Sequence, residues 1–118
     1  MANVYKNIQA TINQAATDVA MYTSPAATTS IIKTIRLFNT HSGDLDVTST
    51  VYDASSTTNF EWDKTNVVAD NHANLLTYNN LLVLEAGDIL KMQTPTTDVI
   101  NMTAAVLQIT RPPEVTTT

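Results

Sequence analysis

The chain has 118 residues, a formal net charge of −5 and no cysteine, and only 14% of its residues are charged. This length fits one domain, which can bury roughly 60–70% of its unfolded surface without covalent cross-links. The lack of cysteine excludes a disulfide framework, a thiolate zinc site and a cysteine nucleophile. Six basic residues against eleven acidic ones argue against binding to a nucleic-acid backbone, so we expect no nucleic-acid partner.

The polar residues are dominated by threonine and asparagine, with 21 Thr and 11 Asn against only 2 Gly. Threonine is β-branched, which disfavours helix interiors and suits the half-exposed face of a pleated strand. The first residues lack the apolar segment of a signal peptide, and no run of about 18 apolar residues occurs in the chain. We therefore expect many strands with one wet face, no membrane partner and no export by the general secretory route.

The first sixteen residues mix two patterns. Ile8, Ile12 and Val19 lie near helical spacing, whereas Val4 and the threonines favour extended chain. We interpret residues 1–16 as an N-terminal arm or an irregular edge strand. A short strand is expected over residues 17–23, followed by a turn at the proline of Ser24-Pro25-Ala26-Ala27.

Residues 29–39 carry the strongest strand signal of the first half, rich in isoleucine. Turn-forming residues follow over 40–44, and residues 45–53 then alternate apolar and polar side chains with a period of two. Together, residues 29–53 predict a β-hairpin with a loop of about five residues.

The second half of the chain contains shorter apolar runs. Residues 60–67 indicate a strand broken by polar residues, and residues 68–80 leave room for one helical turn. Further strands are expected at 81–84, at 89–92 and at 99–110, with a tight turn at Glu85-Ala86-Gly87-Asp88. In the last strand the apolar parity changes before Leu107 and Ile109, which predicts a bulge or burial on both faces.

Six to eight short strands with frequent turns and no amphipathic helix predict an all-β fold. We expect an antiparallel β-sandwich, either a jelly roll or an immunoglobulin-like arrangement. The expected organisation is an arm over 1–16, a sandwich domain over 17–110 and a polar tail over 111–118.

No motif in the sequence describes a catalytic, cofactor or metal site. His41 and His72 are the only imidazoles, and neither has a nucleophile or carboxylate at a recognisable spacing. Four acids in predicted turns could supply calcium ligands, but their spacing fits no EF-hand and turn formation explains them better. These acids are Asp44, Asp46, Glu85 and Asp88. We expect a non-enzymatic protein.

Trp62 is the single tryptophan, and it lies close to Phe60 between two acids. A tryptophan in this setting is more often an anchor of a sandwich core than a platform for a sugar ring. The alternative remains a carbohydrate-binding module in which Trp62 and Tyr78 stack on the sugar.

Two segments resemble small virion proteins of tailed bacteriophages. Residues 21–39 match an opening in which a "Tyr-Thr-x-Pro" turn precedes an isoleucine-rich strand that ends in asparagine. Residues 82–92 match a second part in which "Leu-x-x-Gly-Asp" leads into a strand. The resemblance spans roughly residues 17–109 and implies a β-sandwich building block of the virion. Such proteins are capsid decoration or cement proteins, or components of tails, necks and fibres, and the resemblance implies no catalytic residues.

The resemblance implies a decoration or cement protein that is assembled in the host cytoplasm and binds the major capsid protein lattice, with homo-oligomers expected. A tail, neck or fibre component is the alternative. Apolar residues in a segment too short to bury them require a partner, so we expect the contacts to come from the two terminal segments. The predicted interface residues are Val4, Tyr5, Ile8, Ile12, Arg111, Pro112, Pro113 and Val115.

Overall fold

The computed structural model of the chain describes residues 2–76, 81–97 and 99–110. These residues form nine β-strands and no helix. The strands are β1 (Ala2–Thr11), β2 (Val19–Thr23), β3 (Thr28–Asn39), β4 (Leu45–Asp53), β5 (Thr58–Val67), β6 (His72–Leu76), β7 (Leu82–Leu84), β8 (Ile89–Gln93) and β9 (Ile100–Thr110). The prediction of an all-β fold is confirmed, with one strand more than the expected maximum.

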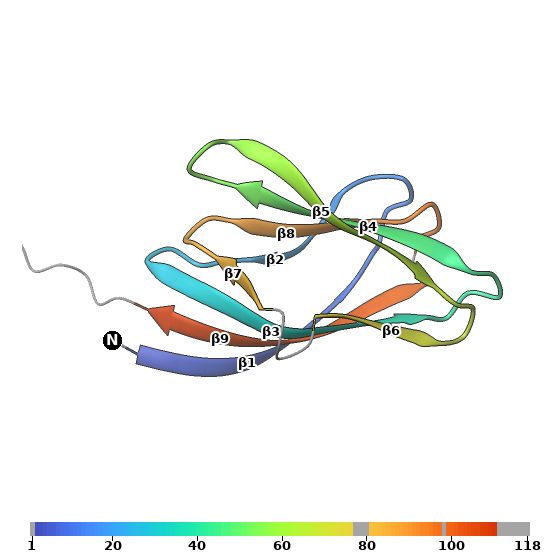
Figure 1. Ribbon diagram of the computed structural model, residues 1–118, viewed down its shortest axis with the longest axis horizontal. Coiled ribbons are helices and arrows are strands. Elements are labelled where there is room, and N and C mark those ends of the chain that lie inside the picture. The colour runs from blue at the N-terminus through green and yellow to red at the C-terminus, as the bar shows by residue number, and fades with distance from the viewer. Residues whose placement is uncertain (1, 77–80, 98, 111–118) are drawn as a thin grey trace, which may run out of the picture.

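The strands form two antiparallel sheets that lie face to face (Figure 1). The larger sheet has the order β1-β9-β3-β6, with β7 also pairing with β3, and the smaller sheet has the order β2-β8-β4-β5. Successive strands change sheet at every step except β4 to β5 and β6 to β7. This is the strand order of a jelly roll in which β6 and β7 together occupy the place of one strand, so the topology decides between the two sandwich types.

The core lies between the sheets and is built by period-two alternation. In β3 the side chains of Ile32, Ile35 and Leu37 are fully buried, and in β9 every second residue from Ile100 to Val106 points inward. The smaller sheet contributes further buried residues such as Leu90. Because this apolar set comes from strands of both sheets, burial of the core holds the two layers together.

The predicted hairpin over residues 29–53 is wrong, because β3 and β4 belong to different sheets. The loop between them crosses from one layer to the other, and β4 pairs instead with β5 and β8. Both edges of β3 are occupied, by β9 on one side and by β6 and β7 on the other, so β4 has no place beside it. In the loop, the buried Asn39 amide donates to the carbonyl oxygens of Gly43 and Val67, both at 3.0 Å. These bonds hold the loop across the end of the sandwich instead of folding it back along β3.

The first segment is a regular edge strand of the larger sheet. All ten residues of β1 pair with β9 without a register shift. Ile12 continues this pairing through a backbone hydrogen bond from its N–H to the carbonyl of Ile100, at 3.0 Å, and its side chain is fully buried. The segment therefore follows the edge-strand interpretation over residues 2–11 and does not form a separate arm there.

Of the two explanations for the parity change near the end of β9, the structure shows apolar residues on both faces and no bulge in β9 itself. The inward positions continue through Val106 to Gln108, a buried polar residue, and Leu107 and Ile109 lie on the outer face. The register shift between β9 and its neighbour occurs in β3, between Ile32 and Thr34. The larger sheet thus carries apolar side chains on its outer surface as well as in the core.

Residues 72–76 form strand β6 where the sequence left room for a helical turn, and residues 77–80 of that stretch lie outside the described residues. No helix in the described part of the chain is long and apolar enough to cross a membrane. The described chain beyond β1 is therefore organised entirely as strands and connecting turns.

Candidate functional site

Three of the four acids considered as calcium ligands accept structural hydrogen bonds from the chain itself. Asp44 accepts a hydrogen bond from the backbone N–H of Ala69 at 2.9 Å, and Asp46 accepts one from the Asn66 amide at 2.8 Å. The buried carboxylate of Asp88 accepts the N–H groups of Ala54 and Glu85, at 3.0 and 2.9 Å. Within the described residues, no three His, Cys, Asp or Glu side chains form a group suited to a metal ion.

The two histidines lie in the loop after β3 and at the start of β6. His41 accepts a hydrogen bond at Nδ1 from the backbone N–H of Gly43 at 3.0 Å, which closes the loop after β3. His72 is exposed at the start of β6, opposite Phe38 in the register. The contacts of the two rings are those of a loop and a strand end, and neither ring is hydrogen-bonded to a hydroxyl or a carboxylate that could complete a catalytic pair in the described residues.

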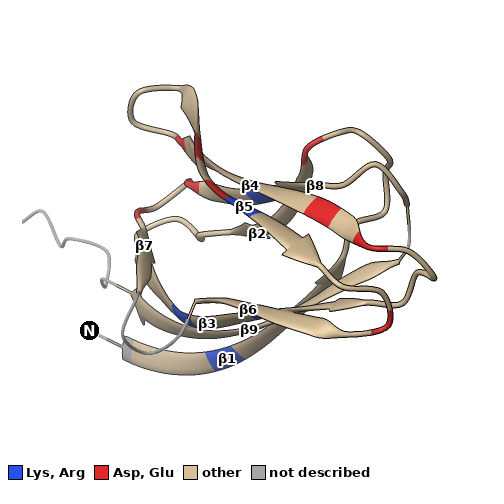
Figure 2. Cartoon of the chain, turned by 45° about the vertical axis from the view of Figure 1, so that its right-hand side comes forward, with Lys and Arg blue, Asp and Glu red and all other residues tan. Residues whose placement is uncertain are grey.

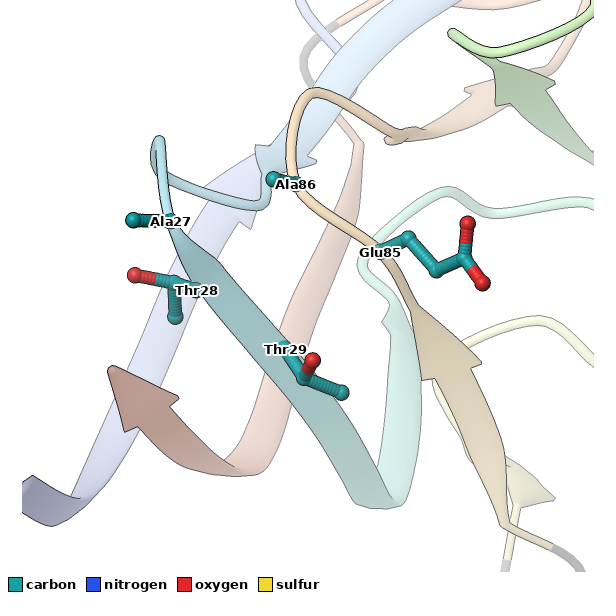
Figure 3. A pocket seen from close by; sticks show the side chains of 5 residues that line it. All are labelled: Ala27, Thr28, Thr29, Glu85 and Ala86. Atoms are coloured by element: carbon teal, nitrogen blue, oxygen red, sulfur yellow. The ribbon is translucent and has the colours of Figure 1, made fainter. Parts of the chain in front are cut away.

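One depression lies beside the turn between β2 and β3 (Figure 3). It has a volume of about 330 Å³ and is lined by Ala27, Thr28, Thr29, Glu85 and Ala86. Figure 3 shows the Glu85 carboxylate pointing away from the Thr28 hydroxyl. That hydroxyl donates to the carbonyl of Ala26 at 3.0 Å. The lining therefore places no base next to a nucleophile.

A second depression, of about 590 Å³, lies between β5 and β7 and includes Trp62 and Phe60 in its lining. Trp62 is half-buried against the core, in accordance with the anchor interpretation, whereas Phe60 is 52% exposed. The Ser55 hydroxyl, which donates to Asp53 at this depression, holds the pKa of that carboxyl below its usual value. Tyr78, the other predicted sugar-stacking residue, lies outside the described residues.

The outer face of the larger sheet carries a row of apolar side chains across four strands. Leu107 of β9 stands opposite Tyr5 of β1 on one side and Ile31 of β3 on the other, and Ile31 stands opposite Val83 of β7. We call Tyr5, Leu107, Ile31 and Val83 the outer row. Tyr5 is 71% exposed and Val83 is 55% exposed, while the two central residues are half-buried. The row is a continuous apolar strip whose two ends are more than half exposed.

The acidic residues of the strands lie only in the smaller sheet. The strands of the larger sheet contain Lys6, Lys33 and Arg36 and no acidic residue, whereas β4 and β5 of the smaller sheet contain four acids. Figure 2 shows basic positions in both sheets, since the smaller sheet also contains Lys64 and Lys91, and acidic positions in the smaller sheet and the loops. Lys33 places its ammonium 5.1 Å from the centre of the Tyr5 ring, a cation–π contact beside the outer row. The outer row therefore lies on a basic face of an acidic protein.

Four of the eight predicted interface residues lie in the described part of the chain, and they differ in exposure. Val4 and Tyr5 are exposed, Ile8 is half-buried against the core, and Ile12 is fully buried. Because the domain already covers Ile12, the argument that this side chain needs an outside partner is wrong. The other predicted residues lie outside the described part of the chain: Arg111, Pro112, Pro113 and Val115.

A buried polar network at one end of the sandwich was not predicted. The Tyr22 hydroxyl lies 2.7 Å from the Ser30 hydroxyl and accepts a bond from the Gln108 amide at 2.6 Å. Ser24 adds a hydroxyl contact to Ser30 at 2.8 Å and donates to the carbonyl of Thr28. The network joins β2 of the smaller sheet to β3 and β9 of the larger one.

We expect Tyr22→Phe to lower the free energy of unfolding by about 1–2 kcal/mol, because the Gln108 amide and the Ser30 hydroxyl each lose a partner. Urea denaturation followed by circular dichroism measures the change. Tyr52→Phe is the matched control, since the Tyr52 hydroxyl makes no hydrogen bond in the structure of the described residues. Equal stability of the Tyr22 variant and the wild type would contradict a structural role for the network.

We expect Asp88→Ala to lower the free energy of unfolding by about 2–3 kcal/mol, because the N–H groups of Ala54 and Glu85 lose a shared acceptor. Asp88→Asn retains one carbonyl oxygen and should lose less than the alanine variant. The same denaturation measurement orders the two variants. A larger loss in Asp88→Asn than in Asp88→Ala would contradict this account of the turn.

Comparisons with known proteins find solved structures of similar fold but no matching family. No protein-family model matches the sequence. No curated protein matches it either. A structure from work on Bacillus endospore appendages, described as disulfide-linked pili, aligns with a TM-score of 0.52 at 12% identity, over 93% of this chain and 89% of that chain.

A second solved structure is that of a virus-like particle of extra small virus from the giant freshwater prawn Macrobrachium rosenbergii. It aligns with a TM-score of 0.51 at 15% identity, over 92% of this chain and 79% of that chain. A module structure of a Clostridium thermocellum xylanase has a TM-score of only 0.41 at 12% identity, over 95% of this chain and 23% of that chain, too low for an argument. The two structures with a TM-score above 0.5 agree with the all-β sandwich that the strand order shows.

Proposed function

We propose that the chain is a non-enzymatic structural subunit of a virion, and that it docks on a neighbouring protein through the outer face of the larger sheet. The outer row carries this proposal. Four cross-strand neighbours, from Tyr5 to Val83, place apolar surface on a face that a freestanding domain would be expected to keep polar. Covering that strip with another protein surface removes it from water.

The charge distribution indicates what kind of surface covers the outer row. Lys33 and Arg36 flank the apolar strip on this face and have no acidic residue beside them in the strands of the larger sheet. A neighbour with an acidic surface would be attracted to this face, and a basic one would be repelled. Packaged nucleic acid is a poor candidate, because the whole chain carries a net charge of −5.

The finer placement that we propose is a capsid decoration or cement protein of a tailed phage, bound to the major capsid protein lattice. The phage-like segments over residues 21–39 and 82–92 support this placement. The two structures similar in fold, a pilus and a virus-like particle, are themselves assemblies of protein subunits. A tail, neck or fibre position uses the same docking face and is the alternative.

The placement is tested by cryo-electron microscopy of particles purified from the cells that produce the chain. Density for the sandwich on the capsid surface, with the larger sheet against the shell, supports the proposal. Density in the tail or neck retains the structural role and overturns the decoration role. Purified particles that lack the chain altogether would overturn both.

We expect Val83→Asp to weaken incorporation into the particle by about tenfold or more, equivalent to about 1.4 kcal/mol, because it places an acid in the outer row. Val83 is 55% exposed, so the fold should tolerate the change. Val68→Asp is the matched control, since Val68 is 51% exposed in the connection after β5, outside the outer row. Quantitative mass spectrometry of purified particles measures both variants, and equal incorporation would contradict docking through this face.

A carbohydrate-binding function is the second candidate, favoured by the aromatic depression that contains Trp62 and Phe60. Phe60 is the better residue to test, because its ring is half-exposed and Trp62 is packed against the core. Glycan binding that is lost in Phe60→Ala at unchanged stability would support this candidate. An array that shows no binding by the wild type would dismiss it.

A further inference from the structure

The four edges of the two sheets differ in how well they are protected against pairing with another strand. Natural edge strands avoid pairing with strands of other molecules because they are short or carry bulges, prolines or charges. β6 and β7 have five and three residues, and β2 has five residues and a register shift. β5 is ten residues long but has a register shift and three charged residues. Each of these edges has at least one protective feature.

β1 is the least protected of the edges, because its one protective feature is the single charge of Lys6. It is ten residues long, pairs with β9 without any register shift, and contains no proline and one charged residue, Lys6. Figure 1 shows it along the outer edge of the larger sheet, next to β9. No strand in the described part of the chain pairs with its other side. β1 is therefore a long, straight edge that is open to pairing.

The backbone groups on this open edge follow from the pairing with β9. The N–H of Ile12 donates to Ile100, so even-numbered residues direct their backbone groups to β9. The odd-numbered residues then direct their N–H and C=O groups away from the sheet. These residues are Asn3, Tyr5, Asn7, Gln9 and Thr11, and all five are exposed. They form a ladder of hydrogen-bonding groups without partners inside the described sheet.

We propose that this edge is a homodimer interface, in which β1 pairs with β1 of a second copy in antiparallel register. Two copies of one strand, related by a two-fold axis, satisfy both open edges with the same set of residues. The larger sheets of the two copies then join into one continuous sheet. This inference deepens the proposed function and rests on it, because it names the contact through which copies of the structural subunit combine.

The register follows from parity and charge. Antiparallel hydrogen-bonded pairs must join odd-numbered residues, so the two registers with nearly full overlap place either Lys6 or Asn7 on the two-fold axis. The first sets two lysines directly opposite each other, which is destabilising. The second sets Asn7 opposite Asn7 and places Lys6 opposite Ile8 of the second copy. We therefore assign Asn7 to the axis, with Tyr5 opposite Gln9.

This register also suits the docking face. The odd-numbered side chains of both copies lie on the outer surface of the joined sheet, so the outer rows of the two copies face in the same direction. The dimer would present two such rows and twice the basic charge of Lys33 and Arg36 to one neighbour. Two linked contacts bind a shared surface more tightly than one.

Single cysteines test the register, because the natural chain contains none. A hydrogen-bonded antiparallel pair separates its Cα atoms by about 5.5 Å, within the range that a disulfide can span. Asn7→Cys should form a covalent dimer under mild oxidation. Asn3→Cys is the matched control, since the two copies of residue 3 would lie about 27 Å apart along the strands. A mixture of Asn3→Cys and Thr11→Cys should form the mixed dimer.

Failure of Asn7→Cys to cross-link more than Asn3→Cys overturns the proposed interface. Analytical ultracentrifugation of the full chain gives a second readout without cysteine. Asn7→Lys should shift the protein to a monomer by placing two further cations at the axis, whereas Asn7→Gln should remain dimeric. Thermal unfolding shows whether each variant is folded, and a dimer in folded Asn7→Lys would also overturn the interface.

The cross-linking experiment and the particle experiment can fail independently, so they test the β1 interface and the proposed function separately. A chain that occupies the particle but neither dimerises nor cross-links through residue 7 overturns the β1 interface and leaves the structural function in place. A chain that cross-links as expected but is missing from purified particles supports the interface and overturns the proposed function.

Discussion

Replacing Ile12 with alanine is expected to lower the free energy of unfolding by about 3 kcal/mol. The side chain is fully buried between the sheets, and the truncation leaves a cavity in the core. Urea denaturation of the full chain, with tryptophan fluorescence as the signal from Trp62, measures the loss. An N-terminal arm held only by a partner would instead predict no loss in the isolated protein.

Val4→Ala is the matched control for this prediction. Val4 lies on the same side of the same segment as Ile12 but is 44% exposed, so its truncation should cost less than about 1 kcal/mol. Similar, small losses in both variants would contradict the placement of Ile12 in the core. The comparison also bears on deletion experiments, because removal of residues 2–16 would strip β1 from β9 as well as remove any contact surface.

The fold class could be predicted from the sequence because the local pattern of apolar and polar residues indicates most of the strands. The isoleucine-rich stretch of β3, the alternation in β4 and the Glu85–Asp88 turn before β8 all lie where they were expected. Pairing partners are set by contacts between residues far apart in the chain. The hairpin over 29–53 failed for this reason, since β9 occupies one edge of β3 and β6 and β7 occupy the other.

β1 was ambiguous for a geometric reason. Val4, Ile8 and Ile12 are spaced four residues apart, and such a spacing keeps side chains on one side of a strand and on one face of a helix. Only the inward-facing Ala10 and the ladder with β9 distinguish the two, and the ladder depends on a strand about 100 residues later in the chain. Local pattern could not decide this segment.

The sequence indicated the candidate docking face only in part. The parity change before Leu107 and Ile109 indicated apolar residues on a second face, and burial on both faces was one of the two interpretations. The alignment of Leu107 with Tyr5, Ile31 and Val83 required the registers of three strand pairs. The network of Tyr22 and Gln108 joins residues 86 positions apart and left no trace in the local pattern.

Asn39→Asp is expected to be among the most damaging single substitutions, with a loss of about 3–5 kcal/mol at neutral pH. The side chain of Asn39 is fully buried, and its amide nitrogen donates to two carbonyl oxygens. A carboxylate of the same shape has no proton to donate and would place a negative charge against both oxygens. Asn39→Ala removes the bonds without adding a charge and should lose less, about 2–3 kcal/mol.

The loss in Asn39→Asp should also depend on pH, with a sign that follows from linkage. Burial beside two carbonyl oxygens raises the pKa of the introduced carboxyl in the folded state above its unfolded value of about 3.9. The folded variant then holds a proton that the unfolded chain releases, so its stability falls as the pH rises from about 4 toward neutrality.

Denaturation at a series of pH values measures this dependence against two variants that lack a new buried acid. Asn39→Ala should show the pH dependence of the wild type, because it adds no titrating group. Asn74→Asp adds the same acid at an exposed position of β6, opposite Arg36, and should change stability by less than about 0.5 kcal/mol. A stability difference between Asn39→Asp and Asn39→Ala that is constant with pH would show that the carboxyl is solvated and that the loop after β3 opens around it.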